Sequence, residues 1–507
     1  MRRTIYLFIG LCVSSLGITQ TGFIQSYDFD HGGIGFYNMV LNEDTLILFG
    51  STQHPTSSQW GLYFAKIDTS GNLLNDRIHY DNQGDSYVFD RNSQVIKTSD
   101  GGYGVVGQTF QRGEAVFFKL NSNGALEFIS EYSDSNALTL RYQNIVETPN
   151  GFISAGVKQQ PDDGYWDTFI IGADNQGNIL WEITYGEYGV YDRLTGISKT
   201  HENEYLITGS TFISSEQVTN LSNMWSMSKA IKVDTMGEIT WEWQGEIEYI
   251  GGSSPDLRQL YPTNDGNWVN EGSTSTLLDN NTLVHQGEIV KRDTDFNIIW
   301  STSFGEPTSN ENNFVDITST PDEGWVAVGQ YVNRIDDDPL GGYRASIIAK
   351  VNADGDSLWS RIDTLFDHTT IVSRPFLSDV LVLPSGSIFA CGYVNKLSPP
   401  PSKSYGWLIK VDAYGCIEPG CNPIVSTENL TPLLEDFSIF PNPVSQNVTV
   451  KGTDIFYIQL LNSTGQILQD KNVYEIANID MQKYPKGSYL IRIKRGNTWL
   501  VKKIIKS

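Results

Sequence analysis

A short turn recurs seven times along the chain and limits the possible folds more than any other feature. Its fullest copy is Asp174-Asn-Gln-Gly177-Asn-Ile-Leu-Trp181, with an apolar stretch before the turn and a Trp-containing stretch after it. Asp or Asn accepts hydrogen bonds from the backbone two residues on, and Gly adopts the positive φ of a tight hairpin. Each copy therefore predicts a β-hairpin. The other copies begin at Asp68, Asn121, Asp234, Asp293, Asn352 and Asp412.

The spacing of these turns is nearly constant, with steps of 53, 53, 60, 59, 59 and 60 residues. Such a period is typical of repeat proteins, in which each unit is too small to bury its own faces. A second turn marks the same seven units, and each time a short apolar strand follows it and ends in Gly. These glycines are Gly50, Gly107, Gly156, Gly209, Gly272, Gly329 and Gly392.

Each unit thus holds four short strands, paired as two tight hairpins. Four-stranded sheets repeated around an axis are the blades of a β-propeller. We therefore predict an all-β protein in which residues 22–421 form a seven-bladed β-propeller. The last unit has only three strands, and Ile24–Phe29 resembles a missing fourth strand. We expect this N-terminal strand to complete the last blade, which would close the ring and leave no open inner edge.

Charge is distributed unevenly along the chain. Residues 20–436 contain 23 Lys and Arg against 55 Asp and Glu, whereas residues 437–507 contain 10 against 4. Binding to nucleic acid and to anionic membranes depends on clustered positive charge. The acidic propeller therefore predicts no nucleic-acid partner.

Residues 1–19 have the features of a signal peptide: a basic start, a short apolar run and small residues at the end. A membrane anchor is the alternative, but the apolar run is short for a spanning helix, and no later stretch could span a bilayer. Cys12 leaves with this peptide, and Cys391 is expected to be a small buried side chain. Cys416 and Cys421 flank a Pro-Gly turn, which in an exported chain predicts a disulfide.

Residues 422–436 have the composition of a linker, and residues 437–507 form a basic module of alternating strands that predicts a small C-terminal β-sandwich. Phe440-Pro-Asn-Pro443, the Gly465 and Gly487 segments and the Lys-rich end resemble the type A C-terminal sorting domain of the type IX secretion system of Bacteroidetes. The resemblance implies export across the outer membrane, with the secretion machinery as partner of residues 437–507, and release or attachment at the cell surface. An ordinary binding module is the alternative. The matching positions are Pro441, Asn442, Pro443, Gly465, Gly487, Lys502 and Lys503.

Catalytic motifs are scarce. Gly102–Gly107 matches a dinucleotide-binding pattern, but it leads into a strand rather than a helix. The six histidines have no metal-ligand spacing, so we predict neither a metal nor a cofactor. The acidic clusters Asp162-Asp163 and Asp336–Asp338 could serve glycoside hydrolysis or calcium binding, although solvated loop charge is the simpler interpretation.

A Trp recurs on the fourth strand of several units, and its spacing from the turn is similar to the tryptophan docking motif of quinoprotein dehydrogenases, which bind pyrroloquinoline quinone. The turns here lack the Thr-Gly pair of that motif. We therefore expect these residues to pack between neighbouring blades as large apolar anchors. They are Trp181, Trp241, Trp300 and Trp359.

The connections between second and third strands are long, as in Thr211–Ser228, Thr274–Gln286, Val332–Arg344 and Val394–Tyr405. Strand alternation places them on the same face as the connections between units, and elaborate loops on a rigid scaffold commonly bind ligands. We predict a secreted or surface binding and adhesion module, with an extracellular glycan or protein as ligand. The alternatives are a glycan-cleaving hydrolase or lyase on this face, or a purely structural surface protein. The candidate ligand-binding aromatics are Trp60, Trp166, Tyr188, Trp225, Tyr343 and Tyr405.

Overall fold

The computed structural model forms two compact units, residues 1–423 and 424–507. Every element among its described residues is a β-strand, and none of these residues forms a helix that could cross a membrane. The structure describes residues 22–28, 32–89, 93–162, 164–187, 189–200, 204–213, 225–249, 257, 259–277, 283–305, 310–333, 343–368, 370–418, 438–462, 467–495 and 498–506.

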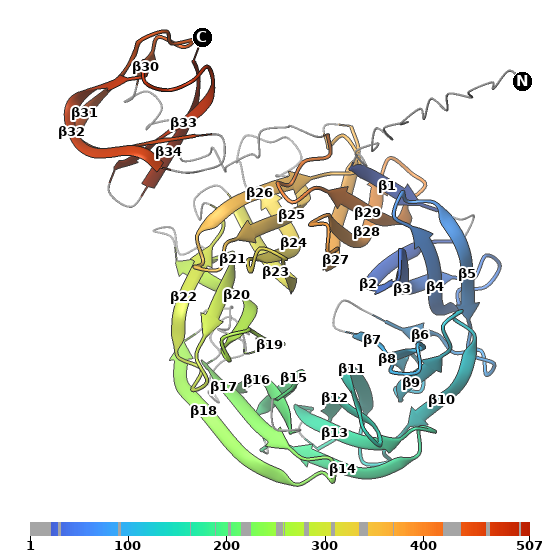
Figure 1. Ribbon diagram of the computed structural model, residues 1–507. Helices are drawn as coiled ribbons and strands as arrows, with labels where there is room; N and C mark the ends of the chain where they lie inside the picture. The colour runs from blue at the N-terminus through green and yellow to red at the C-terminus, as the bar shows by residue number, and fades with distance from the viewer. Residues whose placement is uncertain are drawn as a thin grey trace, which may run out of the picture. The chain divides into compact units, whose positions relative to one another are not determined.

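The described part of the first unit contains seven antiparallel sheets, which Figure 1 shows arranged around a central opening. Four of them follow chain order from the innermost to the outermost strand. These are the first sheet, β2 (Ile34–Asn42), β3 (Thr45–Gln53), β4 (Trp60–Asp68) and β5 (Leu73–His79); the third, β11 (Thr139–Thr148), β12 (Gly151–Gln159), β13 (Trp166–Asp174) and β14 (Ile179–Tyr185); the fourth, β15 (Tyr191–Lys199), β16 (Tyr205–Ile213), β17 (Trp225–Val233) and β18 (Ile239–Tyr249); and the sixth, β23 (Asn310–Ser319), β24 (Trp325–Asn333), β25 (Arg344–Val351) and β26 (Ser357–Asp363).

The other three sheets vary this plan. In the second sheet two short strands, β6 (Tyr87–Val88) and β7 (Val95–Lys97), both pair with β8 (Tyr103–Thr109), which β9 (Ala115–Leu120) and β10 (Leu126–Tyr132) follow. The fifth begins with the two-residue β19 (Tyr261–Pro262) and continues with β20 (Trp268–Leu277), β21 (Leu283–Arg292) and β22 (Ile298–Ser303). The seventh comprises β27 (Val372–Val382), β28 (Ile388–Ser398) and β29 (Lys403–Val411). Its outermost strand is β1 (Phe23–Tyr27), which pairs antiparallel with β29 and sets Ser26 opposite Trp407.

The hydrophobic core of the first unit is divided into clusters that each lie between two neighbouring sheets. Each strand presents alternate residues to the two sides, so both faces of every sheet are buried. One cluster joins the seventh sheet to the first through residues that include Phe389 and Phe36. Another joins the sixth to the seventh, with Trp407 fully buried. The remaining five clusters join the other consecutive pairs of sheets.

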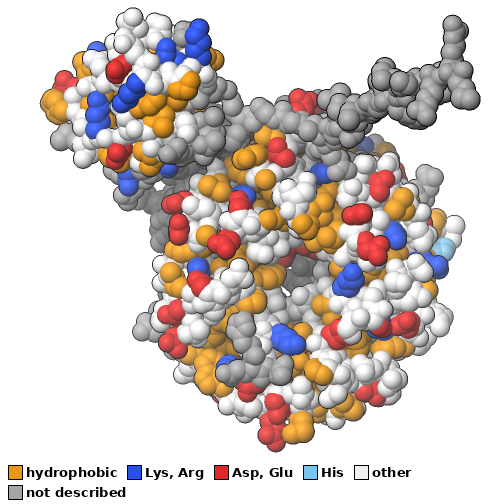
Figure 2. Space-filling model, viewed as in Figure 1, with side chains coloured by type: hydrophobic (Ala, Val, Ile, Leu, Met, Phe, Trp, Pro, Cys, Tyr) orange, Lys and Arg blue, Asp and Glu red, His pale blue; other side chains and the backbone are white. Residues whose placement is uncertain are grey.

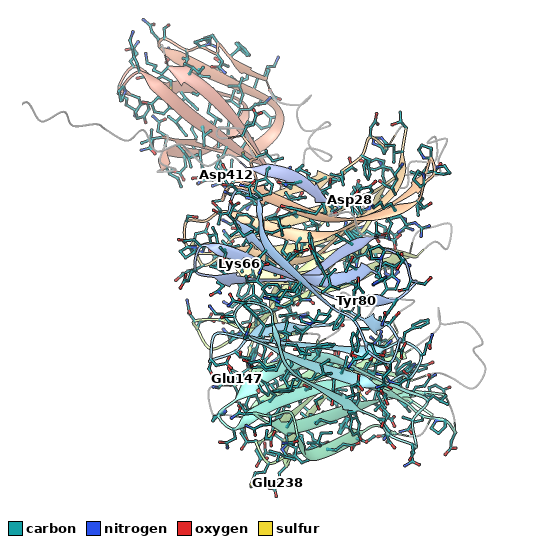
Figure 3. The ribbon with its side chains drawn as sticks, turned by 90° about the vertical axis from the view of Figure 1, so that its right-hand side faces the viewer. Asp28, Lys66, Tyr80, Glu147, Glu238 and Asp412 are labelled. Atoms are coloured by element: carbon teal, nitrogen blue, oxygen red, sulfur yellow. The ribbon has the colours of Figure 1, made fainter. Side chains whose placement is uncertain are left out.

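The two faces of the first unit differ. Figure 3 shows Glu147, Glu238 and Asp412, which lie in or beside hairpin turns, on one side, and Asp28 and Tyr80, which follow outermost strands, on the other. We call these the turn face and the loop face. Some connections expected on the loop face are continued strands, since β28 extends to Ser398 and leaves only residues 399–402 before β29.

The second unit is a single five-stranded sheet rather than the predicted sandwich. Its strands are β30 (Ser438–Phe440), β31 (Asn447–Leu461), β32 (Ile467–Asp480), β33 (Gly487–Arg495) and β34 (Thr498–Lys506). The beginning of β31 pairs with β30 and its end with β33, so one sheet bends over one core. The second half of β32 was not predicted from the sequence. Its buried residues Val473, Ala477 and Ile479 lie on one side of the strand, but Glu475, at a positive φ of 57°, stands between them and interrupts the apolar alternation.

Candidate functional site

At the rim of the first unit, an aromatic side chain of one sheet covers the hairpin turn of the next. A Cβ atom on Gly237 would lie 2.6 Å from the Trp181 indole, and one on Gly355 would lie 2.5 Å from Trp300. Trp181 Nε1 also donates a hydrogen bond of 3.0 Å to the Thr235 carbonyl of that turn. The turn glycine is therefore needed twice: for its positive φ, and to leave room for the neighbouring indole. These contacts agree with the packing interpretation of the recurring Trp residues.

Near the axis, five innermost strands each carry a β-bulge, and the recurring Gly of the second strand, which the structure places inside that strand rather than at its end, lies opposite the bulge. A Cβ atom at Gly329, for example, would lie 1.9 Å from the Asn313 carbonyl oxygen, so only Gly fits there. Each bulge adds one residue that has no partner on the second strand, and this residue lines the central channel. The bulge residues are Tyr37, Gln143, Thr195, Val315 and Ser378.

Residues on the innermost strands, or one or two positions before them, also carry side chains that bond to the backbone of another sheet, and we call these side chains clasps. Asn38 Oδ1 accepts the N–H of Val95 at 3.1 Å, and Gln94 Oε1 accepts the N–H of Ile145 at 3.1 Å. Gly196 has no side chain, and Gln259 of the next sheet instead accepts the N–H of Ile197 at 3.0 Å.

The clasps of the sixth and seventh sheets are a pair of carboxyl groups. Asp316 accepts the N–H of Val380 at 2.9 Å and the Tyr261 hydroxyl at 3.0 Å, while Asp379 accepts the N–H of Met39. Burial raises the pKa of both carboxyls, and the nearby charge of Asp316 raises that of Asp379 further, so the two groups lie close together.

These strands enclose a cavity of about 550 Å³ on the axis. Figure 2 shows a hollow at the centre of the first unit. The lining of the cavity includes all five bulge residues as well as Arg141, Arg193 and Glu271. Asp316 and Asp379 also line the cavity.

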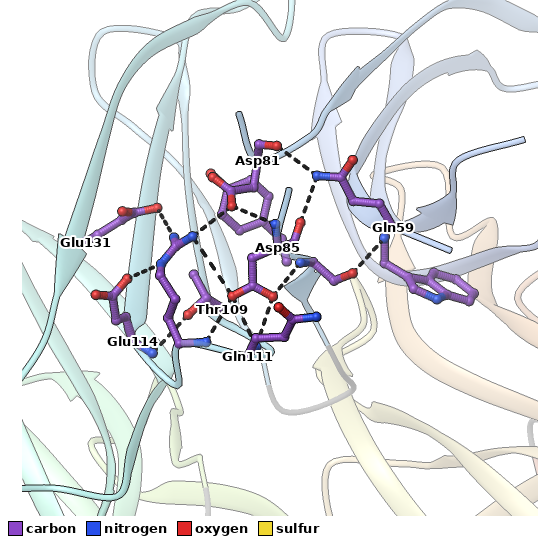
Figure 4. A network of polar contacts seen from close by, with 11 residues as sticks. Gln59, Asp81, Asp85, Thr109, Gln111, Glu114 and Glu131 are labelled. Carbon is purple, nitrogen blue, oxygen red and sulfur yellow. Dashed lines mark hydrogen bonds and ion pairs between the residues drawn. The ribbon is translucent and has the colours of Figure 1, made fainter. Parts of the chain in front are cut away.

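On the loop face, a polar network fixes the connection between the first two sheets (Figure 4). The Arg112 guanidinium contacts Asp81 at 2.7 Å, Glu114 at 2.7 Å and Glu131 at 2.8 Å. Burial acts to raise the pKa of Asp81, but hydrogen bonds from Arg112 and from backbone N–H groups outweigh it and lower the pKa. Asp85, which is also buried, accepts the N–H groups of Gln111 and Arg112. These bonds make this part of the face a rigid scaffold.

The connection after β26 holds two aromatic pairs on the same face. His368 stacks on Tyr343, with ring centroids 4.3 Å apart and planes 25° apart. Phe366 meets Tyr405 edge to face at 5.6 Å. All four rings are half-buried, so each keeps part of its surface in contact with solvent.

The predicted ligand-binding aromatics are thus distributed among several sheets. Tyr343 and Tyr405 are linked through one connection, and Trp60 lies near the seventh sheet, because a side chain at Gly33 would touch both it and Ser404. Trp166 begins β13 in the third sheet, away from these residues. Tyr188 and the Trp225 side chain lie outside the described residues.

Of the predicted acidic clusters, Asp162 is exposed in a turn, while Asp163 and Asp336–Asp338 lie outside the described residues. Among the described residues no group of three or more His, Cys, Asp or Glu could hold a metal ion. Cys391 is free and buried, as expected. Cys416 is disulfide-bonded, but Cys421 lies outside the described residues, so their pairing stays a prediction.

The sorting-motif residues of the second unit hold its last strand. Asn442 Oδ1 accepts the N–H of Ile505 at 2.9 Å, and Val444, directly after Pro443, donates to the Ile505 carbonyl at 2.8 Å. Gly487 lies opposite Lys506 on the neighbouring strand. Lys502 is exposed and Lys503 lies in the same strand, whereas Gly465 lies outside the described residues.

The radial sheets define the first unit as a β-propeller. Residues 438–507 match the model of the secretion system C-terminal sorting domain. The second unit is therefore a type IX secretion sorting domain, which implies export of this propeller protein to the cell surface or the extracellular space.

No curated protein matches the chain. Among solved structures, it is similar to the core factor of S. cerevisiae (11% identity, TM-score 0.39, 82% of this chain and 64% of that one). It is also similar to the β-propeller domain of the Trilobed protease from Pyrococcus furiosus (6%, 0.37, 78% and 99%) and to a thermostable family-43 glycoside hydrolase (12%, 0.32, 54% and 92%). The chain spans less than two thirds of the length of the first of these structures.

Proposed function

We propose that this exported protein is a binding module whose seven-bladed propeller, closed by β1, holds an extracellular glycan on its loop face. Residues 1–19 act as its signal peptide. The observation that carries the proposal is the pair of aromatic contacts made by the connection after β26. His368 and Phe366 fix the orientations of Tyr343 and Tyr405, so the exposed parts of these rings are preorganised.

A carbohydrate suits this site better than a charged polymer. Aromatic rings with one apolar face and a polar edge pack against the C–H groups of a sugar ring and hydrogen-bond to its hydroxyl groups. Residues 20–436 carry a large excess of Asp and Glu, which repels anionic ligands. An uncharged extracellular glycan is not repelled by this charge, and its C–H and hydroxyl groups match the aromatic rings.

The test is a glycan array probed with the full chain and with the double variant Tyr343→Ala/Tyr405→Ala. We expect the variant to lose at least about tenfold in affinity for any glycan that the parent binds, because two central aromatic anchors are removed. Tyr414→Ala is the matched control, since Tyr414 is 67% exposed in a hairpin turn of the seventh sheet. If the array stays silent while a protein ligand is captured through the same two tyrosines, the ligand is a protein instead.

A further inference from the structure

Two buried polar side chains in the central cavity have no hydrogen-bond partner among the described residues. They are Gln143, 2% exposed, whose Oε1 and Nε2 are both unpaired, and Ser378, 3% exposed, whose Oγ is unpaired. Both line the cavity, Gln143 from the third sheet and Ser378 from the seventh. A buried polar group without a partner costs about 1–3 kcal/mol, so native proteins rarely keep one without a reason.

Their positions in the strands give such a reason. Gln143 and Ser378 are bulge residues, so each is the extra residue of its strand and lines the channel. The residue after each of them, Asn144 or Asp379, bonds to another sheet. β-Bulges that re-aim a side chain occur frequently beside binding sites. Tyr37 and Thr195, at the same position in two other sheets, add two hydroxyl groups to the lining.

Charges of both signs line the cavity. Arg141 and Arg193 lie on the third and fourth sheets, whereas Glu271, Asp316 and Asp379 lie on the fifth to seventh. Because burial raises the pKa of Asp316 and Asp379, the acid pair carries less than its full negative charge, which brings the two signs closer to balance. A cleft attracts ions when its charges have one sign, and this one has no such bias. Its volume of about 550 Å³ lies within the range of small-molecule sites, roughly 300–1,000 Å³.

We propose that the central cavity is a second ligand site, separate from the aromatic loop face, which takes a small uncharged molecule rich in hydroxyl groups, of the size of a mono- or disaccharide. The Gln143 amide can both donate and accept a hydrogen bond, as can the Ser378 hydroxyl, so the two satisfy hydroxyl groups in either role. Val315, the apolar bulge residue, contacts the carbon skeleton of the molecule.

The test uses the full chain and isothermal titration with a panel of neutral mono- and disaccharides, with the matching sugar acids alongside. We expect at least one neutral sugar to bind saturably with one site per chain. Gln143→Leu should weaken this binding at least tenfold and yet raise the midpoint of thermal unfolding, because an apolar isostere removes the unpaired amide. A merely structural Gln143 would instead make the variant less stable.

Two controls separate this site from the loop face. Gln176→Leu, in an exposed turn of the third sheet, should leave binding unchanged. Tyr343→Ala/Tyr405→Ala should also leave it unchanged, so the failure of one site does not imply the failure of the other. The proposal is overturned if no neutral sugar saturates the parent protein, if the sugar acids bind more tightly, or if Gln143→Leu binds as the parent does.

Discussion

The rim and the channel of the propeller join the same neighbouring sheets by different means. At the rim, the residue types are almost fixed: an aromatic ring lies over a turn glycine, and side chains such as Trp181 donate hydrogen bonds to the carbonyls of the turn. Beside the channel, the contact is polar and Asn, Gln and Asp replace one another as clasps. The comparison indicates that the rim contacts set the geometry of the ring, while the bulges beside the channel each leave one channel-lining residue whose type differs from sheet to sheet.

The largest expected effect is at the rim. Trp359 is 4% exposed, lies over Gly415 and donates to the Ala413 carbonyl at 3.2 Å. We expect Trp359→Ala to lower the free energy of unfolding by about 4 kcal/mol, as for other buried aromatic truncations. Trp241 is 36% exposed and meets Phe296, which replaces the turn glycine. Trp241→Ala should therefore cost clearly less in chemical denaturation followed by circular dichroism, and an equal cost would contradict this account of the rim.

The next effect tests the bulges beside the channel. Gly329→Ala forces a methyl group against the Asn313 carbonyl, and we expect a loss of about 3 kcal/mol in the free energy of unfolding. Gly272 occupies the same repeat position in the fifth sheet, but the nearest atom to its added Cβ is 3.8 Å away. Gly272→Ala should therefore cost less than about 1 kcal/mol. Equal losses in the two variants would show that the bulge is not what requires glycine.

A third prediction concerns pH. The folded pKa of Asp379 is raised above its unfolded value of about 4, so folding takes up a proton between these two values. The contribution of Asp379 to stability is then fully present at acid pH and is lost as the pH rises through this window. Asp379→Asn keeps a donor and an acceptor in place and should flatten the pH profile of the unfolding midpoint. An equal pH dependence in the parent and in Asp379→Asn would contradict the raised pKa of Asp379.

The smallest effect lies in the hairpin turns. Burial acts to raise the pKa of Asp100, but hydrogen bonds from Lys119 and Thr98 outweigh it and lower the pKa to about 2. The pH dependence of this contribution to stability is opposite in sign to that of Asp379. The stabilisation by Asp100 is present above pH 4 and is lost as the pH falls towards 2. Asp100 is half-exposed, so Asp100→Asn should cost less than about 1 kcal/mol at neutral pH. A larger loss would mean that the turn supports the ring more than its exposure suggests.

The sequence predicted the rim far better than the channel. The turn glycine and the Trp four residues after it recur at fixed spacing, so periodicity alone reveals them. The recurring glycines of the second strands, such as Gly329, were equally visible in the sequence, but the feature that requires them is a bulge on the neighbouring innermost strand. Gln143 and Ser378 share no residue type, so no repeat marks them as equivalent.

The aromatic pairs of the loop face show what the sequence leaves open. Tyr343 and Tyr405 were named as ligand-binding candidates because they are aromatic and flank long connections, and that role stays a prediction. Their ring partners His368 and Phe366 were missed, since nothing in the sequence places the connection after β26 against two strands. Asp316 and Asp379 were missed as well, because they are 63 residues apart and meet only when two sheets pack together.

The pairing of β1 with β29, on which the proposed closed ring depends, can be measured directly by hydrogen exchange. In the full chain we predict slow exchange of the β29 amides that face β1. The variant Ile24→Pro/Gln25→Pro removes two adjacent N–H groups, one of which must bond to β29. We predict that protection is then lost in β29 and in the first sheet, which shares a core cluster with β1. Fast exchange of β29 in the parent, or unchanged protection in the variant, would contradict closure by this strand.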